Sequence, residues 1–193
     1  MDLTQGTPEE KNDRAKKMML WFGIASLIMG FAGWTSAYIV SSGRDDWQHD
    51  YELPSAFFIS TLVILISSIT YHFAKKAEEA GSKRNATAML LLTLVLGLLF
   101  IGLQFYGFSQ LVSRGYYFTG PTSNITMSFI FLIAMVHVVH VVAGLISLLV
   151  VLYRHLKGKY GPGSMLGMEL GITFWHFLGI LWLYLILFMY FFR

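Results

Sequence analysis

The sequence lacks cysteine and has few charged residues, and both features limit what the chain can be. Without cysteine it can form no disulfide, no thiolate metal site and no cysteine nucleophile. Asp, Glu, Lys and Arg make up only 13% of the 193 residues, whereas a soluble domain of this size carries about 25%. The composition therefore argues against a soluble globular domain.

Charge is completely absent from five long apolar runs. A helix needs roughly 20 apolar residues to cross a hydrocarbon core of about 30 Å, and no Asp, Glu, Lys or Arg occurs in residues 18–41, 53–73, 87–110, 126–153 and 170–192. The first run is too long for a signal-peptide core and is not followed by a small-residue cleavage site, so we expect it to be retained. The sequence predicts an all-α polytopic membrane protein: a tail over 1–17 and a single bundle of five transmembrane helices over 18–193.

The positive charges predict the orientation of this bundle. Eleven Lys and Arg residues fall in the tail, between the second and third runs, and between the fourth and fifth, against three on the opposite side. The positive-inside rule then places the N-terminus in the cytoplasm and the C-terminus outside. This uneven distribution also explains the net charge of +3, so we expect no nucleic-acid partner. The eleven are Lys11, Arg14, Lys16, Lys17, Lys75, Lys76, Lys83, Arg84, Arg154, Lys157 and Lys159, and the three are Arg44, Arg114 and Arg193.

Polar residues inside the apolar runs are the candidate functional residues, because polar groups are costly in hydrocarbon. They include Ser67, Ser68, Thr70, His72, Gln104, His137, His140 and His176. His137 and His140 are three residues apart and share a helix face, so they suggest a haem or copper site. The pair has no third ligand or carboxylate beside it, however, and hydrogen bonding between helices is the favoured interpretation.

Carboxylates at membrane depth are missing as well. Transporters and proton pumps usually bury Asp or Glu as a relay, and the nearest candidate here is Glu169, at the start of the fifth run, where a helix N-terminus favours a negative charge. The residues alone thus indicate a helical accessory subunit, with a small membrane cytochrome as the alternative.

Three stretches of sequence resemble one known family. They are the run from Leu91 to Gln104, His137-Val-Val-His140 followed by Gly144, and Gly167-Met-Glu169 followed by Phe174-Trp175-His176-Phe177. Together they resemble subunit III of the haem–copper respiratory oxidases, in its short five-helix form. The resemblance extends over nearly the whole chain from Trp21 onward.

The chain departs from this family at three acidic positions. Leu27, Gly107 and Gly179 stand where the family usually carries carboxylates, and the first of these is linked in the family to proton uptake and carbodiimide reactivity. We therefore expect that no buried acid remains in the chain and that carbodiimide leaves its membrane-embedded part unlabelled, with Glu169 the one site that could react. A scaffolding role is unaffected by these departures.

The resemblance implies a non-catalytic subunit that contains no catalytic, cofactor-binding or metal-ligating residue of its own. Haem and copper would belong to the partner catalytic subunit, which reduces dioxygen to water and which this chain would stabilise while supporting its proton uptake. Structural roles between helices are expected for His137, His140, His176 and Gln104 as hydrogen-bonding residues, and for Glu169 and Trp175 in fixing the fifth helix.

The same resemblance implies the partners and the location. Subunit I of the oxidase is expected as the main contact, with subunit II and membrane lipids, in a bacterial inner membrane. A bound phospholipid and membership of a respiratory supercomplex stay open, as does the choice of cytochrome c or quinol as electron donor. The alternatives are a quinol oxidase subunit III, a nitric-oxide-reductase accessory protein, or a separate b-type cytochrome that uses the histidines.

Overall fold

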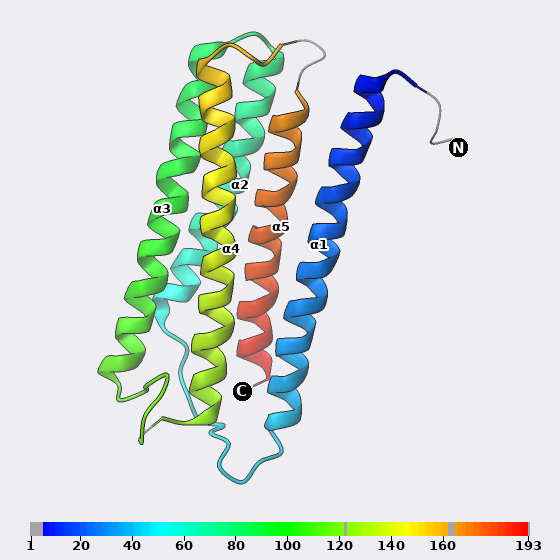
Figure 1. Ribbon diagram of the computed structural model, residues 1–193. Helices are drawn as coiled ribbons and strands as arrows, with labels where there is room; N and C mark the ends of the chain where they lie inside the picture. The colour runs from blue at the N-terminus through cyan, green and yellow to red at the C-terminus, as the bar shows by residue number, and fades with distance from the viewer. Residues whose placement is uncertain (1–5, 122, 162–164, 193) are drawn as a thin grey trace.

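The computed structural model describes residues 6–121, 123–161 and 165–192, and within these ranges every regular element is an α-helix (Figure 1). All five helices are long and apolar enough to span a membrane. The prediction of an all-α fold with five membrane-spanning helices is confirmed, while the direction in which they cross stays a prediction. The helices are α1 (Pro8–Ser41), α2 (Ser55–Glu79), α3 (Lys83–Ser113), α4 (Ile125–Leu156) and α5 (Leu166–Phe191).

Helix α1 begins ten residues before the expected boundary at residue 18, because its start is capped. The Thr7 hydroxyl accepts a hydrogen bond from the Glu10 amide at 3.3 Å, and the Glu10 carboxylate accepts one from the Thr7 amide at 2.9 Å. This reciprocal capping box, with Pro8 at the first helical position, satisfies amides that would otherwise lack partners. Residues 8–17, expected to form part of a tail, are therefore helical.

Helices α2 and α4 also continue past the ends of their apolar runs. In α2 the continuation from Ala74 to Glu79 consists of good helix formers and includes a Lys75–Glu79 ion pair at 3.6 Å. The chain then turns at Gly81, whose φ of 74° is the left-handed conformation that glycine adopts without strain. Hydrophobicity marks only the part of a helix that spans the hydrocarbon core. The helix ends predicted from it therefore did not include these polar last turns.

The two ends of the bundle differ in charge, and we name them accordingly. The basic end comprises the start of α1, the α2–α3 connection (80–82) and the α4–α5 connection (157–165). The acidic end comprises the α1–α2 connection (42–54) and the α3–α4 connection (114–124).

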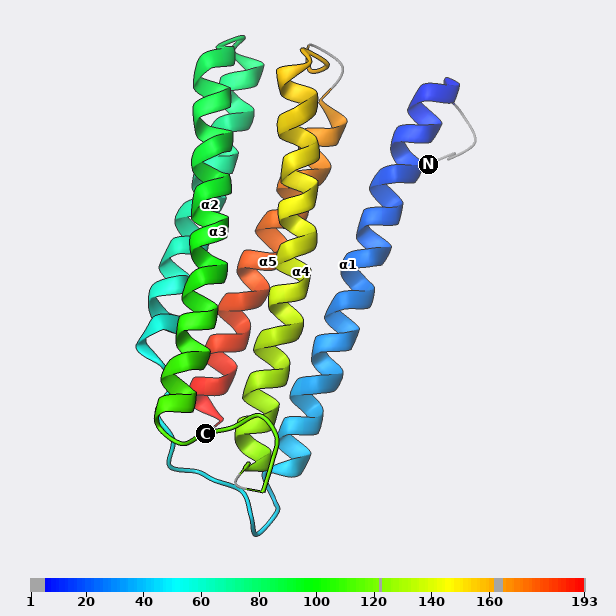
Figure 2. The same ribbon diagram turned by 60° about the vertical axis from the view of Figure 1, so that its left-hand side comes forward.

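The five helices are packed unevenly. Helices α2 and α3 lie side by side along their length, and α4 and α5 pack against them. Helix α1 contacts only α4 and α5, and both views show it leaning away from the bundle toward the basic end (Figures 1 and 2). Four helices thus form a compact body, and the fifth is attached mainly near the acidic end.

Reporter fusions test the orientation that the charges predict. An enzyme active only outside the cytoplasm should be active when fused after Arg193 and silent when fused after Lys83, because the basic end should stay inside. Activity is measured in intact cells, with a fusion after Gly115 at the acidic end as the positive control. Activity after Lys83, with or without activity after Arg193, would reject the predicted topology.

Candidate functional site

The indole of Trp175 on α5 occupies the centre of the bundle and contacts the other three helices of the four-helix body. Its Nε1–H donates to the Ser67 hydroxyl on α2 at 2.9 Å, and the side chain is 1% exposed. Its ring fills the space over two glycines, Gly97 on α3 and Gly144 on α4, where an added Cβ would lie 2.8 Å and 3.2 Å from ring atoms. Only glycine at these two positions lets three helices close around one large ring.

A polar stripe on α2 forms four hydrogen bonds to neighbouring helices. Its residues recur at helical spacing, so they lie on one face, and they are Ser60, Thr61, Ser67 and Thr70. Besides the Ser67 bond, Gln104 Nε2 donates to Ser60 at 2.7 Å, Trp182 Nε1 donates to Thr61 at 3.0 Å, and the Thr70 and Thr93 hydroxyls lie 2.8 Å apart. Gln104 and Trp175 both bond to α2 in this way, and the stripe connects α2 to both α3 and α5.

His137 is not placed as we expected. Its side chain is fully buried, but neither ring nitrogen has a hydrogen-bond partner within the described ranges. Aromatic rings surround it instead: Trp182 is stacked at 5.1 Å, and Phe31 and Phe100 approach edge-on at 6.2 and 6.0 Å. The expected interhelical hydrogen bond is replaced by aromatic packing, which connects α1, α3, α4 and α5.

The other two candidate histidines also lack the expected interhelical hydrogen bonds. His140 Nδ1 lies 2.7 Å from the Val136 carbonyl of its own helix, four residues earlier. His176 forms no hydrogen bond with a described residue, and with His72 it lines an outward-facing hollow of 520 Å³ between α2 and α5. His137 and His140 therefore both lie beside Phe31 of α1, at 6.2 and 5.6 Å, whereas His176 lies at the outward-facing hollow between α2 and α5.

Glu169 at the start of α5 joins three helices at the basic end. Its carboxylate lies 3.2 Å from Lys17 on α1 and 3.3 Å from Lys75 on α2. The Lys17 contact bridges the gap between α1 and the four-helix body. Both cations are partly exposed, so each pair is worth little by itself, but together they position the start of α5 against its neighbours.

One expectation is wrong: a buried acid does remain in the chain. Glu78, in the last turn of α2, has a side chain only 4% exposed, and its Oε2 lies 2.7 Å from Nδ1 of His155, in the last turn of α4. Because these turns lie beyond the apolar runs, neither residue was among the predicted candidates. The helix-forming residues from Ala74 to Glu79 are the signal that extends α2 far enough to bury this carboxyl.

Two of the positions where the family has carboxylates are explained by packing. A Cβ at Gly107 would run into the Phe57 ring, so a glutamate cannot be accommodated there without moving that ring. A Cβ at Gly179 would lie 3.2 Å from the Ser68 hydroxyl. The missing side chains have thus been replaced by neighbours that occupy their space.

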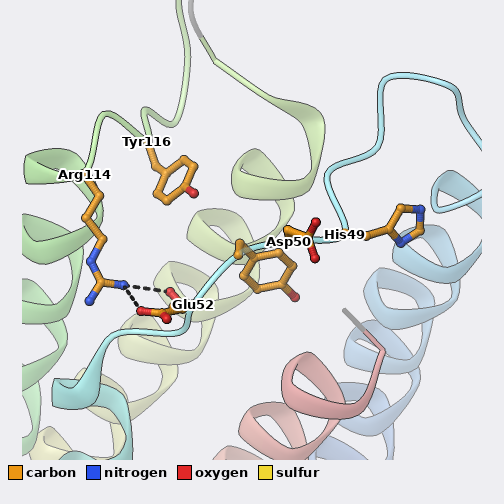
Figure 3. A pocket seen from close by; sticks show the side chains of 6 residues that line it. His49, Asp50, Glu52, Arg114 and Tyr116 are labelled. Atoms are coloured by element: carbon orange, nitrogen blue, oxygen red, sulfur yellow. Dashed lines mark hydrogen bonds and ion pairs between the residues drawn. The ribbon is translucent and has the colours of Figure 1, made fainter.

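The acidic end contains an open polar cavity of 610 Å³, formed where the two connections meet (Figure 3). Arg114 at the end of α3 reaches the α1–α2 connection, donating to the Glu52 carbonyl at 3.1 Å with the Glu52 carboxylate 3.8 Å away. Nearby, a hydrogen bond from Arg44 at 2.8 Å lowers the pKa of the exposed Asp46. Residues 6–121, 123–161 and 165–192 contain no group of three or more His, Asp or Glu side chains that could hold a metal ion.

The architecture and the interior define a class: a polytopic membrane bundle whose centre is filled by tryptophan, glycine and a serine–threonine stripe. A family model described as cytochrome c oxidase subunit III matches residues 49–193. The chain belongs to the cytochrome c oxidase subunit III family.

Individual relatives come from two kinds of oxidase. The chain is 32% identical over 142 residues to a cytochrome bo(3) ubiquinol oxidase subunit 3 of Pseudomonas putida, covering 74% of this chain and 65% of that protein. The corresponding subunit of Pseudomonas aeruginosa is 31% identical over 84% of this chain and 78% of its own length. A cytochrome c oxidase subunit 3 of Corynebacterium diphtheriae is 30% identical over 85% of this chain and 82% of its own. The chain thus spans slightly less than two thirds of the first relative.

Substitution of the glycines under Trp175 tests whether the ring sets the helix spacing. Gly97→Ala should destabilise the bundle by about 1–3 kcal/mol, as overpacking does, because its Cβ would lie 2.7 Å from Leu145 and 2.8 Å from Trp175. Ser67→Ala removes only a hydrogen bond and should cost about 0.6 kcal/mol. Unfolding in detergent, followed by circular dichroism, measures both.

Gly102→Ala on the same helix is the matched control, since an added Cβ there meets nothing within 4 Å. Equal losses of stability for Gly97→Ala and Gly102→Ala would show that the Trp175 contact does not set the spacing.

Proposed function

We propose that the chain is the non-catalytic subunit III of a haem–copper terminal oxidase, which stabilises the catalytic subunit during the reduction of dioxygen to water. The family match over residues 49–193 is the observation that carries this proposal. The interior supports it, because large rings pack against the buried His137 on three sides and the polar groups of α2 are used in holding helices together. Both features are typical of a scaffold.

An outward face between α2 and α5 suits a partner. It is mostly apolar, with Leu65, Ile69 and Phe73, but Ser68, His72 and His176 also line its hollow. His176 comes seven residues after Glu169, which at 1.5 Å per residue places it about 10 Å deeper than the Glu169–Lys75 pair. Polar side chains at such depth usually face protein and seldom lipid. We therefore assign the α2–α5 face to subunit I, as the main contact, with subunit II as a further partner.

The space between α1 and the four-helix body suits a lipid. Near the basic end, a cavity of 510 Å³ is bordered by the cations Lys16, Arg154 and Lys159 and by the acids Glu9 and Asp13. A neighbouring cavity of 320 Å³ is bordered mostly by apolar side chains such as Leu20 and Phe174. Charges of both signs at the mouth and hydrocarbon beyond it match the headgroup and acyl chains of a phospholipid. A bound phospholipid in this cleft would fill the gap that the lean of α1 leaves.

The electron donor distinguishes the two leading versions of this function. A role in a cytochrome c oxidase is supported by the family description and the Corynebacterium relative. A role in a quinol oxidase is supported by the two Pseudomonas relatives, which are named as subunits of ubiquinol oxidases. In both versions this chain carries no redox chemistry of its own, and the location is a bacterial inner membrane.

Affinity purification in mild detergent tests the proposal. A haem-bearing catalytic chain should co-purify and give the preparation its oxidase spectrum, and this chain should be colourless once separated from it. The double substitution His137→Gln and His140→Gln should leave the haem content per complex unchanged, because aromatic rings fill the space around His137. A red chain that loses its haem in proportion to the double substitution would instead be a b-type cytochrome.

The partner face can be tested separately. The double substitution His72→Leu and His176→Leu should weaken association with the catalytic subunit by about 1.2 kcal/mol if each imidazole forms one average interhelical hydrogen bond of about 0.6 kcal/mol. This corresponds to a roughly eight-fold loss, measured as haem-bearing subunit retained per chain across a detergent dilution series.

His140→Leu is the matched control. His140 is also a partly exposed histidine at membrane depth, but it is bonded to its own helix and faces Phe31 on α1. If all three leucines leave the association unchanged, the partner does not bind through the α2–α5 face.

A further inference from the structure

The buried Glu78–His155 pair lies where three helices meet at the basic end, at the top of Figure 1. Glu78 belongs to α2 and His155 to α4, and the side chains are 4% and 2% exposed. Thr87 on α3 completes the group, with its hydroxyl 2.7 Å from Nε2 of His155. These contacts are internal to the chain and do not depend on the proposed partner.

The hydrogen bonds determine how many protons the pair holds. The Thr87 hydroxyl donates its only hydrogen to the Lys83 carbonyl at 2.9 Å, so toward His155 it can act only as an acceptor. Nε2 of His155 must therefore carry a hydrogen and donate it. This leaves Nδ1 facing the Glu78 carboxyl, and one proton fits between them, either on the imidazole of an ion pair or on the carboxyl of a neutral pair.

The distance fits a shared proton, because Glu78 Oε2 and His155 Nδ1 lie 2.7 Å apart and two electron-rich atoms without a proton between them would repel. The oxygen lies away from the line of the ring N–H, so the contact is better described as an ion pair than as a linear hydrogen bond. A small rotation about the last torsion of Glu78, which is soft, would align it.

A cavity connects the pair to the outside at the basic end. It has a volume of 470 Å³, and Glu78 is part of its wall together with Glu79, Lys83 and Tyr160. The hydroxyls of Tyr160 and of the nearby Tyr71 are buried, and neither has a hydrogen-bond partner in the part of the chain that the structure describes. Buried polar groups of this kind are usually satisfied by ordered water, so the cavity offers a wet path to the carboxyl.

Several titratable groups surround the pair, and Glu78 acts by its charge on one of them, Tyr160. On α2, Glu79 is already paired with Lys75 at 3.6 Å. From α3, Lys83 lines the cavity, and from α4, Arg154 acts by its charge on Tyr160. Burial raises the pKa of Tyr160, so this residue is a neutral hydroxyl next to the pair at ordinary pH.

We propose that Glu78 and His155 form a proton-binding site, which holds one proton between carboxyl and imidazole and exchanges it with water through the cavity at the basic end. Loading converts a carboxylate, a neutral imidazole and a hydronium ion into the protonated pair and water. Release reverses this, and no other reactant is needed. The alternative is a permanent ion pair that only ties α2 to α4 and never exchanges its proton.

Dicyclohexylcarbodiimide distinguishes the two, because it reacts with a carboxyl that still has its proton. The proton moves to a carbodiimide nitrogen, the carboxyl oxygen adds to the central carbon, and rearrangement leaves a stable N-acylurea. In the purified intact protein, Glu78 should be labelled, because the shared proton resides part of the time on its carboxyl. His155→Gln should be labelled as well, because glutamine offers the proton no second place. Peptide mass mapping locates the adduct.

Glu79 provides the matched control. Its side chain is 51% exposed and ion-paired, so Glu79→Gln should leave the labelling as in the wild type, whereas Glu78→Gln should abolish it. Labelling of His155→Gln but not of the wild type at any pH would overturn the proposal in favour of a permanent ion pair.

Infrared spectroscopy gives a second readout that does not depend on access by the reagent. A carboxyl C=O band that is absent in Glu78→Gln should shift when the protein is transferred to D₂O, because the shared proton exchanges with solvent. If both the wild type and His155→Gln stay unlabelled, this measurement decides: no such band, or a band that does not shift, would overturn the proposal. Either result leaves the family assignment intact, since that assignment is tested by co-purification.

Discussion

The close approach of helices around the Trp175 ring is the constraint on which the rest of the bundle depends. A ring of this size fits at the centre only because α3 and α4 present Gly97 and Gly144 to it, and its N–H is satisfied only because α2 presents Ser67. In lipid, helices gain little from burying apolar surface against one another, so packing at small residues and polar contacts drive association. The Trp175 side chain provides the packing against small residues and also a polar contact, and it joins four helices.

The need for polar contacts between helices in lipid also explains the polar face that α2 turns toward the interior. Its stripe of Ser60, Thr61, Ser67 and Thr70 faces Gln104, Thr93 and two indoles, and nearly all of these groups are buried. Small hydroxyls can lie against a neighbouring helix without separating the backbones, and they can also bond to their own carbonyls. A scaffold built in this way has a rigid four-helix body that needs no ligand to hold it.

Helix α1 is attached more loosely than the other helices. Its lean away from α4 and α5 leaves a cleft lined by charged side chains, and the Glu169–Lys17 ion pair joins α5 to α1 across it. Between α2 and α5, another face presents two imidazoles at membrane depth. The proposed lipid and the proposed catalytic subunit would occupy these two places. The buried Glu78–His155 pair lies at the basic end.

The sequence by itself determined the number of helices, their approximate spans and the family, because hydrophobicity and length decide which segments cross a membrane. Gln104 and Trp175 could also be selected as candidates from the sequence, because an amide or an indole N–H inside an apolar run needs a hydrogen-bond partner. The sequence could not show that His137 would be enclosed by aromatic rings, or that His176 would face outward, because the rotation of each helix depends on how glycines and large side chains fit together. Glu78 and His155 are 77 positions apart and lie outside the apolar runs. Only the tertiary structure shows that α2 and α4 both continue beyond their apolar runs. It also brings their last turns together, so that a carboxyl is buried against an imidazole.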